Sequence, residues 1–315
     1  MSAYLPFSPE ERLPAQLIKR LKFDFNTLKK INPKLILASI TPYGQTGPYR
    51  NWKGYDINCC ALGGITNAMG SPDREPLTCP LFQGDYQAGI SAAIAIMIAL
   101  FSRDISGKGT HIDISEAECW ATFHIGMAAQ DFIAEGRVRK RSGHRAFHRP
   151  YLDEVLPCKD GYICFDTPQN RQWHRFLEVL GNPEWANDPI FKDRIKTTDE
   201  FGDKADDYLS DWLKQHNKEE IFKLFQDNRV PVAPIKTIAE IVNDAHLKKR
   251  GYFVEIDHPS AGTLKYPGVG YKFSKTPFTV RYPAPCLGEH NEEVYGGRLG
   301  YSKTELVTLR RAGVI

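Results

Sequence analysis

The sequence lacks the features that identify several classes of protein. Its seven cysteines are an odd number without a Cys-x-x-Cys pair, which argues against a zinc site or a disulfide framework and predicts a cytoplasmic location. The net charge of +3 is small, so composition gives little support to a nucleic-acid or membrane-surface role. Residues 1–20 mix acidic and basic side chains without an apolar stretch, so we expect no signal peptide.

What is present fits an ordinary globular protein. Hydrophobic residues make up 42% of the chain and charged residues 25%, and 315 residues can bury a large core, so we expect two domains. Up to about residue 134 the patterns alternate between helix and strand. This order is typical of a layered α/β domain with a largely parallel sheet. The expected helices span residues 9–30, 55–61 and 116–134, and the expected strands span 35–40 and 110–114.

The second half of the chain has a different pattern. A hairpin is expected over residues 151–157 and 162–166, followed by helices over 169–180, 204–215, 218–227 and 238–244 and a last helix capped by Ser302 and Glu305. We therefore predict a smaller α+β domain. The predicted organisation is a large domain over 1–125, a linker over 126–150, the small domain over 151–250, and a return linker with the C-terminal part of the large domain over 251–315.

The stretch around Asp85 lies directly before an apolar helix. The 14 residues from Ala88 to Phe101 are apolar on nearly every face, which predicts a core helix too short to span a membrane. One helical face is formed by Ile90, Ala93, Ile94, Met97, Ile98 and Phe101. Asp85 is then either an ordinary N-cap or a reactive carboxylate held at a helix N-terminus, and the residues alone favour the cap.

A basic segment, residues 137–149, separates the two halves. It contains six arginine or lysine side chains and two histidines, and it has no apolar periodicity. We interpret it as a solvated interdomain connection. A phosphate-bearing ligand or nucleic acid remains an alternative, which one short basic run supports only weakly.

Five ordered motifs resemble one enzyme family. They occupy residues 32–40 (NPKLILASI), 44–49 (GQTGPY), 84–89 (GDYQAG), 107–115 (GKGTHIDIS) and 287–294 (LGEHNEEV). In order and spacing they are similar to the family III CoA transferases. That family includes formyl-CoA transferase, the carnitine and bile-acid CoA transferases and the alpha-methylacyl-CoA racemases. The resemblance runs from about Leu17 to the C-terminus.

The resemblance implies that Asp85, in its Gly84-Asp85 motif, is a nucleophile. In the transferases this aspartate attacks an acyl-CoA thioester to give an aspartyl-acyl anhydride, which the CoA thiolate converts to an aspartyl-CoA thioester. A carboxylate nucleophile divides one difficult exchange of CoA between acyl groups into reversible steps of similar energy. The implied partners are an acyl-CoA substrate, a carboxylic acid and a second copy of the chain in an interlocked homodimer. No permanently bound cofactor, metal, nucleic acid or membrane is expected.

The racemase branch of the family needs different residues. Its Gly-His-Asp-x-Asn motif reads Gly54-Tyr55-Asp56-Ile57-Asn58 here, and tyrosine, with a pKa near 10, is a poor base at neutral pH. A second racemase acid falls near Asn170, which cannot transfer protons. Transfer is therefore favoured over racemisation or epimerisation. Tyr55 and Asp56 are expected to face or support the substrate, although Tyr55 is equally compatible with a packing role.

The resemblance also implies a site for CoA. Arg20 and Lys53 stand where formyl-CoA transferase has basic residues near the adenosine phosphates, and the alternative is that both are solvated surface charges. The glycine-rich loop of formyl-CoA transferase has no counterpart, and residues 142–150 take its place. This difference argues against strict formyl or oxalate specificity.

The resemblance begins after the strand and helix units that open the family's large domain. It therefore implies an α/β fold with an incomplete Rossmann-like large domain and a smaller α+β domain. Removing parallel strands would expose strand edges and apolar surface. The missing units belong to a longer or separate chain, or this protein is a truncated, non-catalytic remnant.

Overall fold

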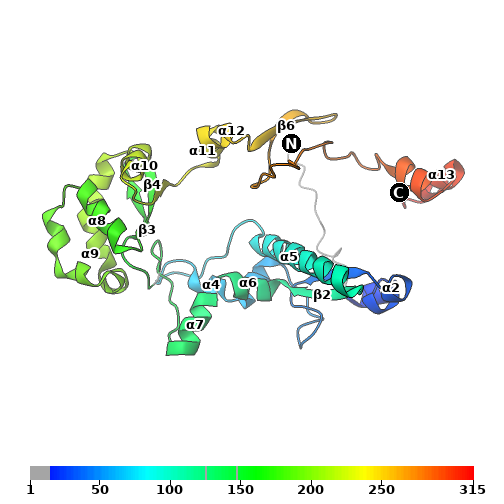
Figure 1. Cartoon of the computed structure of the whole chain (residues 1–315), viewed down its shortest axis with the longest axis horizontal. Helices are drawn as coiled ribbons and strands as arrows, with labels where there is room; N and C mark the ends of the chain where they lie inside the picture. The colour runs from blue at the N-terminus through cyan, green and yellow to red at the C-terminus, as the bar shows by residue number, and fades with distance from the viewer. Residues whose placement is uncertain (1–14, 125, 147) are drawn as a thin grey trace. The chain divides into compact units, whose positions relative to one another are not determined.

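The computed structural model describes residues 15–124, 126–146 and 148–315. The chain divides into two compact units, the first extending to Pro234 and the second running from Ile235 to Ile315. The first unit contains a parallel-sheet segment, residues 15–135, and an antiparallel-sheet segment, residues 151–234 (Figure 1). The four-part domain organisation proposed from the sequence stays a prediction.

The parallel-sheet segment has the predicted α/β character. Strands β1 (Ile36–Thr41) and β2 (Thr110–Ser115) pair in parallel, with Ile36 opposite Thr110. The helices are α1 (Ala15–Arg20), α2 (Phe25–Ile31), α3 (Asp56–Leu62), α4 (Ile65–Ala68), α5 (Gln83–Ser106), α6 (Glu116–His124) and α7 (Gly126–Glu135). The prediction of a single helix over residues 9–30 is wrong within the described residues. The helix is interrupted between α1 and α2, where Lys22 has a φ of 60°. Residues 9–14 of that prediction lie outside the described residues.

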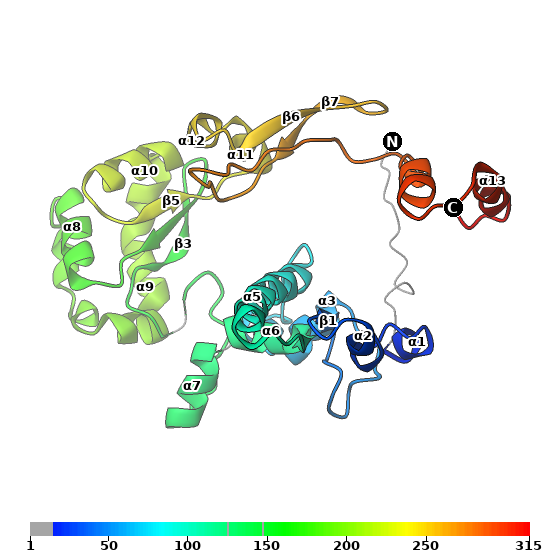
Figure 2. The ribbon, with the colours of Figure 1, turned by 45° about the vertical axis from the view of Figure 1, so that its right-hand side comes forward.

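Helix α5 differs most from its prediction. It is 24 residues long rather than 14, and only its small residues Gly84, Ala88, Ala92 and Ala99 are buried. These residues let the helix lie close to β1, β2 and α6. Figure 2 shows β1 and α6 next to α5. Its large side chains are exposed: Ile90, Ile94, Met97, Ile98, Phe101 and Ile105. The prediction of a core helix buried all round is therefore wrong.

Helix α5 combines an exposed apolar face with a length of 24 residues. The helix is long and apolar enough to cross a membrane, with a mean hydropathy of 1.7, but one such helix is weak support for a membrane span because core helices of soluble proteins pass the same test.

In the described part of the chain, β1 and β2 pair only with each other, so each has an open edge. The exposed edges and apolar surface expected from the sequence are therefore present.

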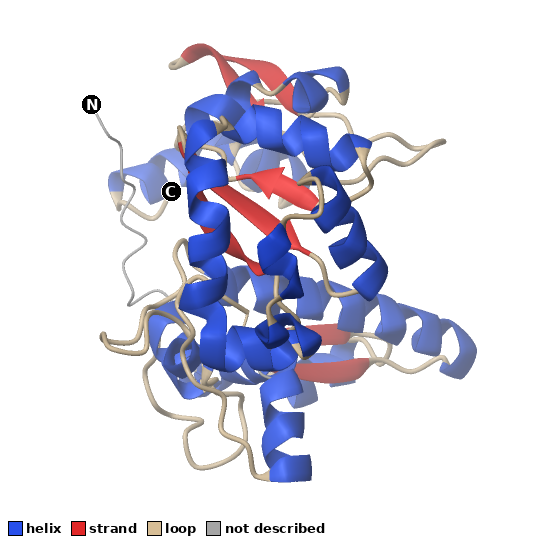
Figure 3. Ribbon diagram, turned by 90° about the vertical axis from the view of Figure 1, so that its left-hand side faces the viewer, coloured by secondary structure: helices blue, strands red, loops and turns tan. Residues whose placement is uncertain are grey.

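The antiparallel-sheet segment follows the predicted hairpin-and-helix pattern. Strands β3 (Asp153–Cys158), β4 (Gly161–Asp166) and β5 (Val232–Pro234) form one sheet in that order, with helices packed on it (Figure 3). The helices are α8 (Asn170–Val179), α9 (Arg194–Gln215) and α10 (Lys218–Asp227), with short 3-10 turns η2 (Glu184–Asn187) and η3 (Pro189–Lys192). Helix α9 begins ten residues before the predicted 204 because Asp193 caps it, accepting hydrogen bonds from Ile195 N and Lys196 N.

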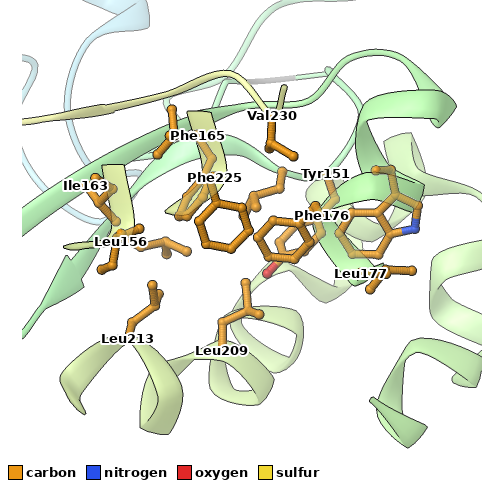
Figure 4. Close-up of a cluster of buried hydrophobic side chains, with 14 of the residues drawn as sticks. Tyr151, Leu156, Ile163, Phe165, Phe176, Leu177, Leu209, Leu213, Phe225 and Val230 are labelled. Carbon is orange, nitrogen blue, oxygen red and sulfur yellow. The ribbon is translucent and has the colours of Figure 1, made fainter. Parts of the chain in front are cut away.

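The main hydrophobic core lies in this antiparallel-sheet segment (Figure 4). Phe165, Phe176 and Phe225 pack with ring centroids between 5.1 and 5.4 Å apart. By contrast, the buried clusters under α5 and α6 are small and consist mostly of alanine and cysteine. Burial of large aromatic side chains is therefore concentrated away from the segment that contains Asp85.

The second unit contains short elements. These are α11 (Ile238–Asn243), α12 (Ala245–Lys249), the hairpin β6 (Phe253–His258) with β7 (Gly262–Pro267), the π-helical turn η4 (Glu292–Arg298) and α13 (Lys303–Arg311). The predicted cap of the last helix is confirmed, because Glu305 N donates to Ser302 Oγ and Ser302 N donates to Glu305.

The basic segment is not the solvated linker that we expected. Arg139 pairs with Asp131, Arg149 pairs with Asp153, and Arg141 donates to the carbonyl oxygen of Ser71. Arg145 pairs with three carboxylates of the antiparallel-sheet segment. Most of the basic side chains are thus engaged by the protein's own acceptors, which disfavours binding to nucleic-acid phosphates.

Candidate active site

The chain enters α5 through a strained turn. Leu81 and Phe82 both have left-handed backbone conformations, with φ of 62° and 52°. Such conformations cost a bulky residue roughly 1–2 kcal/mol each and are often found at functional sites. Phe82 is the N-cap of α5, so Asp85 is the third helical residue, and the interpretation of Asp85 as the cap is wrong. Its predicted place at a helix N-terminus is confirmed.

Two buried carboxylates lie beneath this turn. Gly84 N donates to Asp56 Oδ1 at 2.6 Å, and Asp56, the first residue of α3, is only 7% exposed. A Cβ atom added to Gly84 would lie 2.5 Å from Asp56 Oδ1, 2.5 Å from Glu116 Oε1 and 2.3 Å from Trp120 Nε1. Only glycine fits here, because α5 approaches both α3 and α6 this closely.

The structure brings together three of the predicted site residues. Asp56 and Gly84 are joined by a hydrogen bond, and Asp85 follows Gly84 in the exposed first turn of a long helix, where the helix dipole stabilises negative charge. Tyr55 precedes Asp56 as the N-cap of α3 and is 42% exposed. Asp85 is therefore an exposed residue on a backbone that the hydrogen bond between Gly84 and Asp56 holds in place.

Glu116 and Trp120 were missed by the sequence analysis. Both lie on α6 and are almost completely buried. The sequence pattern of Ser115 followed three residues later by Glu118 predicts only a cap at the start of this helix, and the backbone N–H of Glu118 does donate to Ser115 Oγ at 3.3 Å. Nothing in the sequence distinguishes Glu116 from Glu118, since the contact with Gly84 depends on how α5 and α6 pack.

The two predicted CoA-binding residues are exposed. Arg20 is the last residue of α1, and Lys53 lies in the loop before α3. Neither takes part in a hydrogen bond or an ion pair within the described part of the chain. Both side chains are therefore available to a ligand, but the structure does not place either against Asp85, and their role stays a prediction.

One group of side chains has the composition of a metal site. His144, Glu154 and Asp206 each offer a ligand atom, and these atoms lie within 4.8 Å of one another. However, Arg145 Nε donates to Glu154 Oε2 at 3.1 Å, and the same guanidinium also contacts Asp206 and Asp203. The guanidinium occupies the space between these acidic side chains, so the group is better described as an ion-pair network than as a metal site.

The excess of carboxylates in this network predicts a pH-dependent stability. Glu154 is 3% exposed, and burial, together with the charge of Asp206, raises its pKa from 4.5 to about 9. The unfolded chain releases this proton near pH 4.5, whereas the folded protein retains it up to about pH 9. Unfolding therefore releases a proton between these values, and the free energy of unfolding falls as the pH rises.

We expect Glu154→Gln to remove this decline, whose slope is at most on the order of 1.4 kcal/mol per pH unit. Urea unfolding at several pH values between 4.5 and 9 measures it. Glu178→Gln, at an exposed position of α8, is the matched control and should keep the wild-type slope. A wild-type slope in Glu154→Gln would contradict this assignment.

Comparison with known proteins decides the family. The model of CoA-transferase family III matches residues 11–291. The chain belongs to CoA-transferase family III. Similar proteins include the succinyl-CoA–L-malate CoA-transferase beta subunit of Chloroflexus aurantiacus, which is 31% identical over 92% of this chain and 72% of its own length. The formyl-CoA:oxalate CoA-transferase of Afipia carboxidovorans is 30% identical over 97% of this chain and 76% of its own length.

Solved structures support the same family and fold. A CaiB/BaiF family protein from Brucella suis has a TM-score of 0.76 and 28% identity to this family III chain, over 90% of this chain and 73% of the other. The resemblance inferred from the five motifs and the α/β fold class are thereby confirmed. This chain is an enzyme of the CoA-transferase family.

Proposed function

We propose that this protein transfers CoA from an acyl-CoA to a carboxylic acid, with Asp85 as the nucleophile. An Asp85 oxygen attacks the thioester carbonyl, the C–S bond breaks, and CoA leaves as a thiolate. The thiolate then attacks the Asp85 carbonyl of the anhydride, releasing the first acid and forming an aspartyl-CoA thioester. The acceptor carboxylate attacks this thioester, and the released thiolate attacks the acceptor's acyl carbonyl, which gives the new acyl-CoA and restores Asp85.

The observation that carries this proposal is the position of Asp85. It lies in the first turn of α5, is open to solvent, and follows a glycine whose N–H is held by buried Asp56. An exposed carboxylate can reach an incoming thioester, and a fixed backbone holds it in one orientation. The helix N-terminus favours the ionised form that attacks.

The relatives suggest a substrate class. Their names pair succinyl-CoA with L-malate or D-citramalate, and formyl-CoA with oxalate. We therefore propose a short acyl-CoA as donor and a di-acid as acceptor, acted on by a homodimer in the cytoplasm. The loop at residues 142–150 lacks the run of glycines expected of a strict formyl or oxalate enzyme, so succinyl-CoA is the first donor to test.

A transfer assay separates this function from its alternatives. The purified chain is incubated with succinyl-CoA and each of malate, citramalate, oxalate and glutarate, and new acyl-CoA products are separated by chromatography. Deuterium incorporation at the acyl α-carbon without transfer would instead indicate a racemase or epimerase. Neither reaction, combined with no thermal shift in the presence of CoA, would indicate a non-catalytic chain.

The predicted phosphate contacts can be tested with two forms of CoA. If Arg20 or Lys53 binds the 3′-phosphate, its replacement by alanine should raise the KM for succinyl-CoA roughly three- to tenfold, because an exposed charge contact contributes little more. The same variant should leave the KM for the dephospho form unchanged. Lys34→Ala, at another exposed lysine, is the control. Equal effects on both forms would exclude contact with this phosphate.

A further inference from the structure

The antiparallel-sheet segment contains a cavity of about 800 Å³. It lies between the start of α8, the turns η2 and η3, and the start of α9. The buried side chains Trp173, Leu177 and Phe191 form its apolar lining, and Asn170, His174, Lys192 and Arg194 are among its polar residues. Its size and its mixture of apolar surface with a few polar groups are typical of small-molecule sites.

Arg194 is an unusual residue to find in this lining. It is only 8% exposed, yet it forms no ion pair with any carboxylate of the described chain. Its Nε and Nη2 donate to the carbonyl oxygens of Tyr151 and Thr167, and the guanidinium lies 5.1 Å from the centre of the Trp173 ring. Its Nη1 makes one long contact, 3.5 Å to Asn170 Oδ1. The charge is thus buried without a counter-ion, which is unfavourable.

The acidic residues of the cavity do not compensate for this charge, because both are engaged elsewhere. Asp188 accepts hydrogen bonds from Lys204 Nζ at 2.7 Å and from Tyr208 Oη at 2.8 Å, and hydrogen bonds including that from Ile190 N hold its pKa at about 2. Asp193 accepts the N–H groups at the start of α9. Because Lys204 offsets the charge of Asp188, Arg194 and Lys192 are left with one carboxylate, Asp193, between them, and the cavity carries a net positive charge.

We propose that this cavity binds a small organic carboxylate with an apolar body. A carboxylate oxygen accepts a hydrogen bond from Arg194 Nη1, whose N–H groups are the least used of the guanidinium. Lys192 and His174 supply further donors at the cavity wall, and the apolar body packs against Leu177 and Phe191. Arginine is well suited to this role because it stays charged when buried and binds carboxylates strongly. The site uses none of the residues proposed for CoA transfer.

Asn170→Asp is the sharpest test, because it supplies the missing counter-ion. The substitution keeps the size and shape of the side chain and places a carboxylate beside Arg194 Nη1, at the start of α8, where negative charge is favourable. Calorimetry with benzoate on the full chain is expected to show one site. We expect benzoate affinity to fall at least tenfold in Asn170→Asp. It should fall roughly three- to tenfold in Lys192→Ala, because Lys192 is exposed, and stay unchanged in Lys196→Ala, which changes a lysine outside the cavity.

Two comparisons test whether the carboxylate group of benzoate makes the contact and whether benzoate binds in this cavity rather than at Asp85. Benzamide, which has the same ring without the charge, should bind at least tenfold more weakly than benzoate. Asp85→Ala should bind benzoate as the wild type does, even when transfer activity is lost, so this inference and the proposed function fail separately. Benzoate affinity that is unaffected by Asn170→Asp, absent from the wild type, or lost in Asp85→Ala would overturn the assignment.

Discussion

Asp85→Ala is expected to reduce CoA transfer by at least about a thousandfold, because it removes the atom that forms both covalent intermediates. Only the uncatalysed exchange of acyl groups would remain. The loss should appear in kcat, since the alanine leaves the surrounding surface open to CoA. Steady-state assays with succinyl-CoA and the best acceptor measure this loss.

The fold should survive this substitution, because the Asp85 side chain is exposed. The expected cost is about 0.3–1 kcal/mol, the value of a carboxylate in the first turn of a helix. Asp85→Asn tests the same point with a side chain of equal size and should be as inactive. Asp104→Ala changes an exposed aspartate at the other end of α5 and should keep wild-type activity. Substantial transfer by Asp85→Ala would show that another group is the nucleophile.

Gly84→Ala is expected both to destabilise the protein and to reduce its activity. The added methyl group would lie less than 3 Å from three polar atoms of Asp56, Glu116 and Trp120, so α5 must move away from α3 and α6. Overpacking of this kind costs about 1–3 kcal/mol. The shift also moves Asp85, and a displacement of about 1 Å at a reacting group can reduce the rate a hundredfold.

Gly89→Ala is the matched control on the same helix. Its added methyl group meets nothing within 4 Å, and alanine in a helix interior is about 0.5–1 kcal/mol more favourable than glycine. The two substitutions should therefore change the free energy of unfolding in opposite directions, which thermal or urea unfolding can measure. Equal effects at the two positions would mean that α5 does not pack against Asp56 and Glu116 as described.

The sequence predicted the helix after Asp85 but not its surroundings. The apolar residues of α5 occupy every face, so their period cannot show which face is covered. In the structure the alanine face packs against β1, β2 and α6, and the larger side chains remain exposed. Which face is buried depends on elements far away in the sequence, and no local pattern contains that information.

The candidate site was only partly accessible to sequence reasoning for the same reason. Sequence motifs identified Asp56, Gly84 and Asp85, since each of these residues lies within a short contiguous motif. Glu116 and Trp120 complete the site through packing between helices, which spacing does not reveal. The basic segment was misinterpreted because the acidic partners of Arg145 lie between 9 and 61 residues further along the chain.

The most direct test of the proposed mechanism is to trap the activated carbonyl group of Asp85. The protein is incubated with succinyl-CoA without an acceptor, treated with hydroxylamine and digested, and the peptide containing Asp85 is sequenced by mass spectrometry. Hydroxylamine cleaves a thioester or an anhydride of Asp85 to a hydroxamate on that side chain. We expect the hydroxamate at Asp85, only when succinyl-CoA is present, and not in Asp85→Asn. An unmodified Asp85 in a preparation that transfers CoA would contradict the covalent mechanism.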